Sequence, residues 1–211
     1  MSERNKQTLY DLRRRLPSSE EFAAFMANVD IMNARAMVLI TTSYVDSTLE
    51  RLISTEFVTL TESKSNSLFR SHSAPLGSFS SKIALGHVLG MFGDNFADHL
   101  NNIRSIRNAF AHSMLEIDFE QTEIVNECTK LKPASLCDFE YRPDTESARE
   151  KFVTCSIIIN TILMNGCRCA LELEASGYRR KPWPDKLSRR HFLDSRIPGA
   201  TETMPPHPPQ S

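Results

Sequence analysis

The segment that decides the fold is DNFADHLNNIRSIRNAFAH, residues 94–112. Its large apolar residues recur at spacings of four, three and seven: Phe96, Leu100, Ile103 and Phe110. These spacings put the residues on one face of an α-helix, so the segment is predicted to be one amphipathic helix with that face toward the core. At about 100° per residue, Arg107 falls inside the same apolar arc.

Arg107 is therefore the residue that needs an explanation. A guanidinium on a core-facing stripe is costly unless it is paired or partly solvated. The sequence predicts that Arg107 has either a buried carboxylate partner on a neighbouring helix or a functional cleft to reach into.

The other segments with helical periodicity surround this one. Helices are predicted over residues 20–29, 30–55 with Asp30 as the N-cap, 78–93 with Gly93 as the terminating glycine, 122–131 and 146–175. Residues 57–76 are rich in Ser, Thr and Asn and are predicted to form a loop. Gly86 and Gly90 lie four apart, which predicts that a neighbouring helix passes close to them.

Several such helices around one core make an all-α fold, an antiparallel helical bundle. It is expected to cover residues 18–178, between a basic N-terminal segment at 1–17 and a Pro-rich basic tail at 179–211. The tail has little to bury and is expected to be disordered. Residues 57–61 and 115–119 alternate with period two, so a minor two-stranded pairing between them stays open.

Composition excludes a strong global drive toward nucleic acid or membranes. The chain has 211 residues, 40% of them hydrophobic, and a formal net charge of −1. The tail differs from the rest, with seven basic and three acidic residues from position 179 onward. Contacts with RNA or DNA are therefore expected, if anywhere, at the tail cations Arg179, Arg180, Lys181, Arg189 and Arg190.

Location and cofactors follow from what the sequence lacks. Residues 1–16 are polar and basic, without the apolar stretch of a secretory signal. Residues 152–173 are apolar but interrupted by polar side chains, which favours a buried helix over a membrane span. The five cysteines form no C-x-x-C pair. We therefore expect a cytoplasmic protein with reduced cysteines and with no metal or cofactor.

Three pieces, in this order, carry a resemblance to a known family. They are PLGSFSSKI at residues 75–83, Leu89-Gly90, and IRNAFAH at residues 106–112. They resemble the mannitol operon repressor family of small all-helical bacterial proteins, over roughly residues 30–131. The Arg-Asn-x-x-x-His pattern also matches the motif of the HEPN superfamily. The resemblance implies a HEPN-like bundle, a homodimer, and a regulatory protein that lowers expression of a carbohydrate-uptake operon.

The HEPN motif also implies an alternative, a metal-independent endoribonuclease. In that case Arg107 would hold the scissile phosphate, His112 would move a proton, and Asn108 would orient a reacting group. His112 follows Arg107 by five residues, so the two diverge by about 140° on a straight helix. Convergence would require a distorted helix end or one residue from each of two subunits.

In the regulatory hypothesis, Arg107, Asn108 and His112 have structural roles. Arg107 would pair with a buried carboxylate, while Asn108 and His112 would bond the following loop. Arg104 shares a helix face with Asn108 and His112 and is a candidate phosphate or partner contact. No helix-turn-helix or basic recognition helix is visible, so repression would act through a protein partner or through the basic tail.

Overall fold

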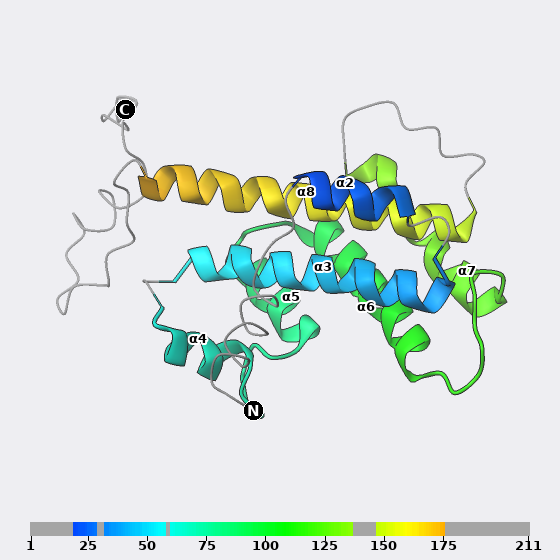
Figure 1. Ribbon diagram of the computed structural model, residues 1–211, viewed down its shortest axis with the longest axis horizontal. Helices are drawn as coiled ribbons and strands as arrows, with labels where there is room; N and C mark the ends of the chain where they lie inside the picture. The colour runs from blue at the N-terminus through cyan, green and yellow to red at the C-terminus, as the bar shows by residue number, and fades with distance from the viewer. Residues whose placement is uncertain (1–18, 29–31, 58–59, 137–146, 176–211) are drawn as a thin grey trace, which may run out of the picture.

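The computed structural model describes residues 19–28, 32–57, 60–136 and 147–175. Within these residues the structure is helical and contains no strand, which confirms the all-α class (Figure 1). The elements are α2 (Ser19–Asn28), α3 (Ala34–Thr55), α4 (Glu62–Phe69), α5 (Phe79–Val88), α6 (Asp94–His112), α7 (Thr122–Thr129), the short 3₁₀ helix η2 (Pro133–Ser135) and α8 (Ala148–Ala175).

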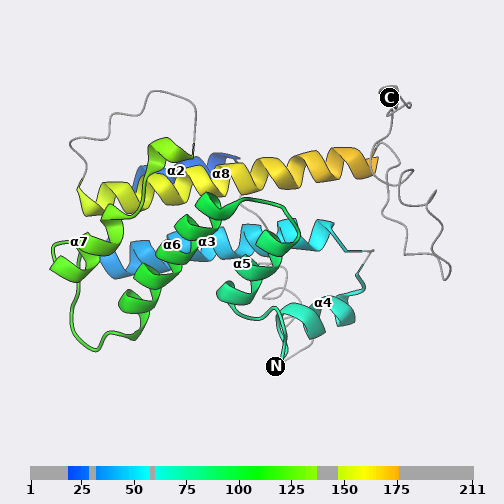
Figure 2. The same ribbon diagram turned by 180° about the vertical axis from the view of Figure 1, so that it is seen from behind.

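The two longest helices, α3 and α8, lie side by side and run parallel (Figures 1 and 2). Arg149 donates to the carbonyl of Met32 at 2.9 Å, and Thr48 bonds Asn160 at 2.8 Å further along both helices. Contacts therefore advance in the same direction on the two helices, so the antiparallel arrangement that we expected is wrong for this pair. Helices α4 to α7 form the connection that returns the chain to the start of α8.

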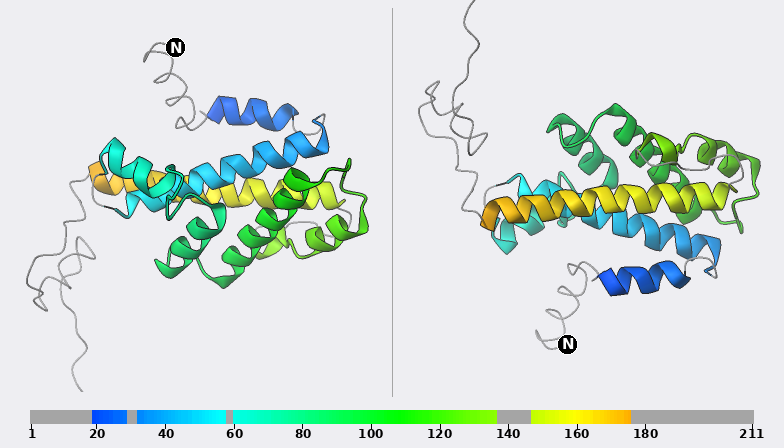
Figure 3. Two further views of the ribbon diagram at one scale, coloured as in Figure 1. Left: turned by 90° about the horizontal axis from the view of Figure 1, so that it is seen from below. Right: turned by 90° about the horizontal axis from the view of Figure 1, so that it is seen from above.

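Helix α6 crosses α3 and packs beside α5 (Figure 3). Its bounds are the predicted ones, and its apolar stripe forms the centre of the core. Leu100, Ile103, Ile106 and Phe110 are all fully buried. The periodicity argument was therefore right about which face of this helix is covered.

Helix α8 is apolar along most of its length. By length and composition Ala148–Glu172 could cross a membrane, which is weak evidence because core helices have the same properties. Phe152, Ile159 and Leu163 are fully buried against the rest of the protein, whereas Ile162 and Leu171 are exposed. In this fold α8 has the position of a core helix with one open face.

Two helix starts differ from the predictions. Helix α3 begins at Ala34, where Asn33 is the N-cap and its side chain accepts from the Arg35 amide, so Asp30 is not the cap. The segment expected to be a loop contains α4, which is capped by Thr61 and anchored by the buried Phe69. The Ser- and Asn-rich composition predicted a loop, but burial of one aromatic side chain stabilises a short helix there.

The roles of the glycines in and after α5 differ from the predicted ones. Helix α5 ends at Val88, and Gly90 has φ +70°, so Gly90 and not Gly93 is the left-handed residue that terminates it. A Cβ at Gly86 would lie 2.7 Å from the ring of Phe92, so the close neighbour is that side chain and not a helix backbone. Gly93 is the N-cap residue of α6.

The alternating segment after α6 is not a strand. Among the described residues of 57–61 and 115–119 no strand forms, and residues 58–59 lie outside the description. The buried Phe119 lies between the rings of Phe110 and Phe152, at centroid distances of 5.2 and 5.7 Å. Packing of this ring explains Phe119, whereas Leu115 at the start of the segment is exposed. The expected segments at 1–17 and 179–211 lie outside the described residues.

Candidate functional site

The Arg-Asn-x-x-x-His motif forms the last turns of α6. The helix is regular up to His112 and ends with the amide of Ser113 bonded to the carbonyl of Ala109 at 3.0 Å. Arg107 is half-buried and His112 is exposed. The helix end is regular, so Arg107 and His112 diverge by about 140° around α6, and no hydrogen bond between them occurs in the described residues.

Arg107 faces α3 but is not locked onto a carboxylate. Its Nη1 donates to Oδ1 of the neighbouring Asn108 at 3.0 Å. Asp46 on α3 is close enough for the guanidinium charge to lower its pKa, but no ion pair of Arg107 within 4 Å occurs among the described residues. Asp46 is therefore a neighbouring negative charge of Arg107 and not the ion-pair partner that the sequence predicted.

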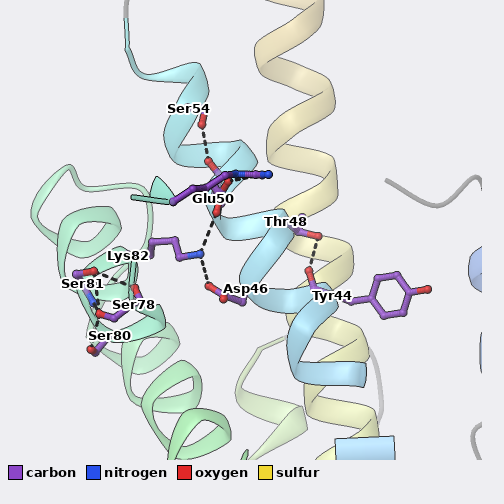
Figure 4. Close-up of polar contacts among 10 residues, drawn as sticks. Tyr44, Asp46, Thr48, Glu50, Ser54, Ser78, Ser80, Ser81 and Lys82 are labelled. Carbon is purple, nitrogen blue, oxygen red and sulfur yellow. Dashed lines mark hydrogen bonds and ion pairs between the residues drawn. The ribbon is translucent and has the colours of Figure 1, made fainter. Parts of the chain in front are cut away.

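A group of charges around the buried Lys82, beside Arg107, was missed by the sequence analysis. Lys82 on α5 is 3% exposed, and its Nζ lies 2.7 Å from Asp46 Oδ1 and 3.1 Å from Glu50 Oε2 (Figure 4). Glu50 Oε1 also accepts from Arg70 Nη2 at 3.0 Å. We call Asp46, Glu50, Arg70 and Lys82 the Lys82 cluster. It ties α3 to α5 and to the residue that ends α4.

The cluster carries an electrostatic strain at Asp46. Burial raises the pKa of Asp46 above its ordinary 3.8, and this outweighs the ion pair with Lys82, which lowers it. The negative charge of Glu50 raises the pKa of Asp46 further, and Arg107 opposes that effect. The fold therefore holds this carboxyl where its charged form is less favourable than in water.

A signal for the cluster was present in the sequence. Asp46 and Glu50 are four residues apart, so both carboxylates project from the same side of α3. They lie at the margin of its apolar face, where Val45 and Leu49 are fully buried. Two acids at the edge of a buried stripe predict a buried cation opposite them, although the pattern does not say which one.

Arg104 on α6 has a shielded side-chain N–H group without a hydrogen-bond acceptor among the described residues. The side chain is half-buried, and the shielded group is its Nε–H. Asn108 is half-buried and His112 exposed, so the face that the three residues share runs from partly covered to open.

His99 is a buried histidine that joins two parts of the fold. Its Nδ1 lies 2.6 Å from the carbonyl of Asn95, and its Nε2 accepts from the amide of Lys132 at 3.0 Å. This bonding assigns a neutral ring with the proton on Nδ1, and the ring joins α6 to the segment before η2. Within residues 19–28, 32–57, 60–136 and 147–175, no three His, Cys, Asp or Glu side chains gather in a way that could hold a metal ion.

The described cysteines form no disulfide bond among themselves. Cys128, Cys155 and Cys167 are buried, and Cys169 is exposed, so Cys167 and Cys169 do point to different faces of α8 as predicted. Burial raises the pKa of Cys128 to about 12, which leaves its thiol protonated and unreactive at neutral pH.

The residues that follow α6 are fixed by α3. Arg35 Nη2 donates to the carbonyls of Ser113 and Leu115, at 3.1 and 2.8 Å. A cation at the carboxyl end of a helix also complements the helix dipole. The backbone beyond His112 is therefore held in place, while the side chains of Met114 and Leu115 remain exposed.

The tail cations proposed to contact nucleic acid, Arg179, Arg180, Lys181, Arg189 and Arg190, lie outside the described residues. The resemblance to mannitol operon repressors rests on the quoted sequence pieces alone. Comparison of the chain with protein-family models, with curated proteins and with solved structures finds no match.

Proposed function

We propose that this chain is a non-enzymatic regulatory interaction protein, similar to the mannitol operon repressors, that lowers expression of a carbohydrate-uptake operon. The observation that supports the choice is the regular end of α6, on which Arg107 and His112 diverge by about 140°. A ribonuclease of this type needs both groups at one phosphate. Here one group is half-buried toward α3 and the other is exposed at the helix end.

In this proposal Arg107 contributes to structure. Its hydrogen bond to Asn108 fixes the guanidinium, and its charge offsets part of the cost of the partly buried Asp46 carboxylate. The pair of helices α3 and α6 then carries a favourable charge contact beside the Lys82 cluster. Loss of Arg107 would change the packing and electrostatics of the bundle and not a chemical step.

The proposed repression acts through a protein partner, with the chain as a homodimer. A DNA-recognition helix would need exposed cations along one face, whereas Arg104 and Arg107 on α6 are half-buried. Direct sequence recognition by the described helices is therefore not part of the proposal.

The test is genetic and uses the whole chain. Deleting the gene should raise the transcript of a carbohydrate-uptake operon, and the wild-type gene should restore repression. A gene with His112→Ala should also restore it, because His112 has no role in the proposed regulation. Unchanged transcripts of every sugar-uptake operon after deletion would contradict the proposal.

The endoribonuclease remains the second candidate because of one feature of Arg107. A guanidinium has five N–H donors, and one of them is used by Asn108. His112 is exposed, so a second chain could supply the missing group at a shared interface. This candidate requires an active site made of Arg107 from one subunit and His112 from the other.

A further inference from the structure

The loop that follows α6 presents two apolar side chains to solvent on a fixed backbone. Met114 is fully exposed and Leu115 is 75% exposed. Arg35 donates to the carbonyls of Ser113 and Leu115, and the buried Phe119 anchors the other end of the loop. Because the backbone is already held in place, a partner that covers these side chains would lose little entropy in ordering the loop.

Carboxylates follow these two side chains along the chain. Residues 113–129 contain five acidic residues and no lysine or arginine. Four of the five are exposed, and none of these four has an ion pair within 4 Å among the described residues. We call the following six residues the acidic loop surface: Met114, Leu115, Glu116, Asp118, Glu120 and Glu123. An apolar centre with a charged rim is the usual composition of a small protein-binding surface.

A segment of the same chain carries the complementary chemistry. Residues 179–184 read Arg-Arg-Lys-Pro-Trp-Pro, so three consecutive cations stand next to the only tryptophan of the protein. Tryptophan and arginine are among the residues that most often dominate the binding energy of protein interfaces. Cations opposite a rim of carboxylates give the electrostatic complementarity that selects a partner. Residues 179–184 therefore match the acidic loop surface in both apolar and charged character.

The length of the chain decides which copy supplies this segment. Helix α8 has 28 residues and is therefore about 42 Å long. The acidic loop surface lies at the end of the parallel pair of α3 and α8 where both helices begin, because Arg35 in the first turn of α3 holds the loop (Figure 1). Trp183 follows the last residue of α8 by eight positions, which extend over about 29 Å at most. The Trp183 of a chain therefore does not reach its own acidic loop surface.

We propose that residues 179–184 of one copy of this chain bind the acidic loop surface of a second copy. Trp183 packs against Met114 and Leu115, where the methionine sulfur makes a favourable contact with the ring. The three cations of the segment lie opposite the carboxylates. Reciprocal exchange of the two segments gives a dimer with two equal contacts. The proposal goes beyond the regulatory function, because it names a contact between copies and no regulated gene.

The first measurement uses the full chain and its single tryptophan. Sedimentation velocity gives the fraction of dimer over a series of protein concentrations, and the emission of Trp183 is recorded for the same samples. The emission should shift to shorter wavelength as the dimer forms, because the indole ring leaves water for an apolar contact. Sodium chloride should weaken association, since exposed charges are screened. A chain that stays monomeric, or a dimer that forms with no change in the emission, would overturn the proposal.

A charge exchange tests which residues meet. One variant carries Arg179→Glu with Arg180→Glu, and the other carries Glu116→Lys with Glu120→Lys. Each variant alone should dimerise about ten-fold or more weakly than wild type, because like charges then face each other. An equal mixture of the two should recover most of the wild-type affinity, since both contacts in a mixed dimer are again between opposite charges. Two folded variants whose mixture associates no better than either alone would contradict the contact.

The matched control reverses two exposed cations outside both regions, Arg51→Glu with Lys64→Glu, and should dimerise within about two-fold of wild type. Circular dichroism checks the fold of every variant. If the lysine variant is unfolded, Glu116→Gln with Glu120→Gln replaces it and should also weaken association. Association that persists in both reversed variants would assign the dimer to another surface, such as one that binds the basic segment at 1–17. This outcome would overturn the contact and leave the proposed regulatory function standing.

Discussion

Replacing Lys82 with methionine should destabilise the protein by about 3 kcal/mol. Removing one partner of a buried ion pair costs about 3–5 kcal/mol, because the remaining charge stays buried without compensation. Lys82 is 3% exposed and has two carboxylate partners. The lower end of the range applies because the side chains of Asp46 and Glu50 are 33% and 17% exposed, so water can solvate them in part.

The assay is urea unfolding followed by far-ultraviolet circular dichroism, with the midpoint and the slope fitted separately. Lys130→Met is the matched control. Lys130 also pairs with a carboxylate, that of Glu127, but their side chains are 54% and 34% exposed. This surface pair should contribute less than about 1 kcal/mol, and its loss should leave the unfolding curve nearly unchanged.

Acid should reduce the effect of Lys82→Met. At a pH near 3 the carboxyl of Asp46, whose pKa is raised by burial, becomes largely protonated in the variant, so part of the uncompensated charge disappears. The free-energy difference between wild type and variant should therefore be smaller at pH 3 than at pH 7. A Lys82→Met protein no less stable than Lys130→Met at pH 7 would refute the reasoning that the cluster is a buried, coupled unit.

Three further substitutions test other parts of the structure. The pKa of Asp46 is raised in the folded state, so the free energy of unfolding of the wild type falls as the pH rises from 3.8 through that raised pKa. Asp46→Asn has no carboxyl at this position and lacks this fall. Urea titrations between pH 3 and 7 should therefore show the variant becoming more stable relative to the wild type. His99→Ala should cost about 2–3 kcal/mol in the same unfolding assay, because the amide of Lys132 loses its acceptor and a cavity remains. Gly86→Ala should cost about 1–3 kcal/mol, because the new Cβ would lie 2.7 Å from the Phe92 ring.

Each of these three has a comparison that could contradict it. If the difference in free energy of unfolding between Asp46→Asn and the wild type did not change with pH, burial would not raise the pKa of Asp46 as inferred. His72→Ala, at an exposed histidine, should cost less than about 0.5 kcal/mol, and an equal cost at position 99 would contradict the structural role of His99. Gly93→Ala has no atom within 4 Å of the new Cβ and should cost less than about 1 kcal/mol, so an equal effect at position 86 would contradict the contact with Phe92.

The sequence was sufficient to predict the elements with strong periodicity. Helix α6 begins and ends where its apolar spacing predicts, because a pattern sustained along a helix of 19 residues outweighs local composition. Helix α4 was not predicted, because one buried Phe69 and a Thr61 cap stabilise it and neither has a periodic signature. Gly93 was assigned to the wrong helix end because Gly90, three residues earlier, has the left-handed conformation.

Spatial relations between helices were harder to predict than the helices themselves. The parallel course of α3 and α8 depends on how α4 to α7 return the chain, which no local pattern records. The Lys82 cluster joins residues 32 positions apart in sequence, Glu50 and Lys82. The position of Arg107 on the core-facing stripe could be predicted. That it has no ion pair within 4 Å among the described residues could not, because Asp46 pairs with Lys82 instead.

The central claim is that Arg107 and His112 do not form a catalytic pair. The most direct measurement is cleavage of a labelled RNA in EDTA by wild type, by Arg107→Ala, by His112→Ala, and by an equimolar mixture of the two variants. We expect no cleavage that depends on either residue, with both variants folded. Cleavage by wild type that each folded variant abolishes would contradict the claim, and recovery of part of that activity in the mixture would place one residue from each subunit in a shared active site.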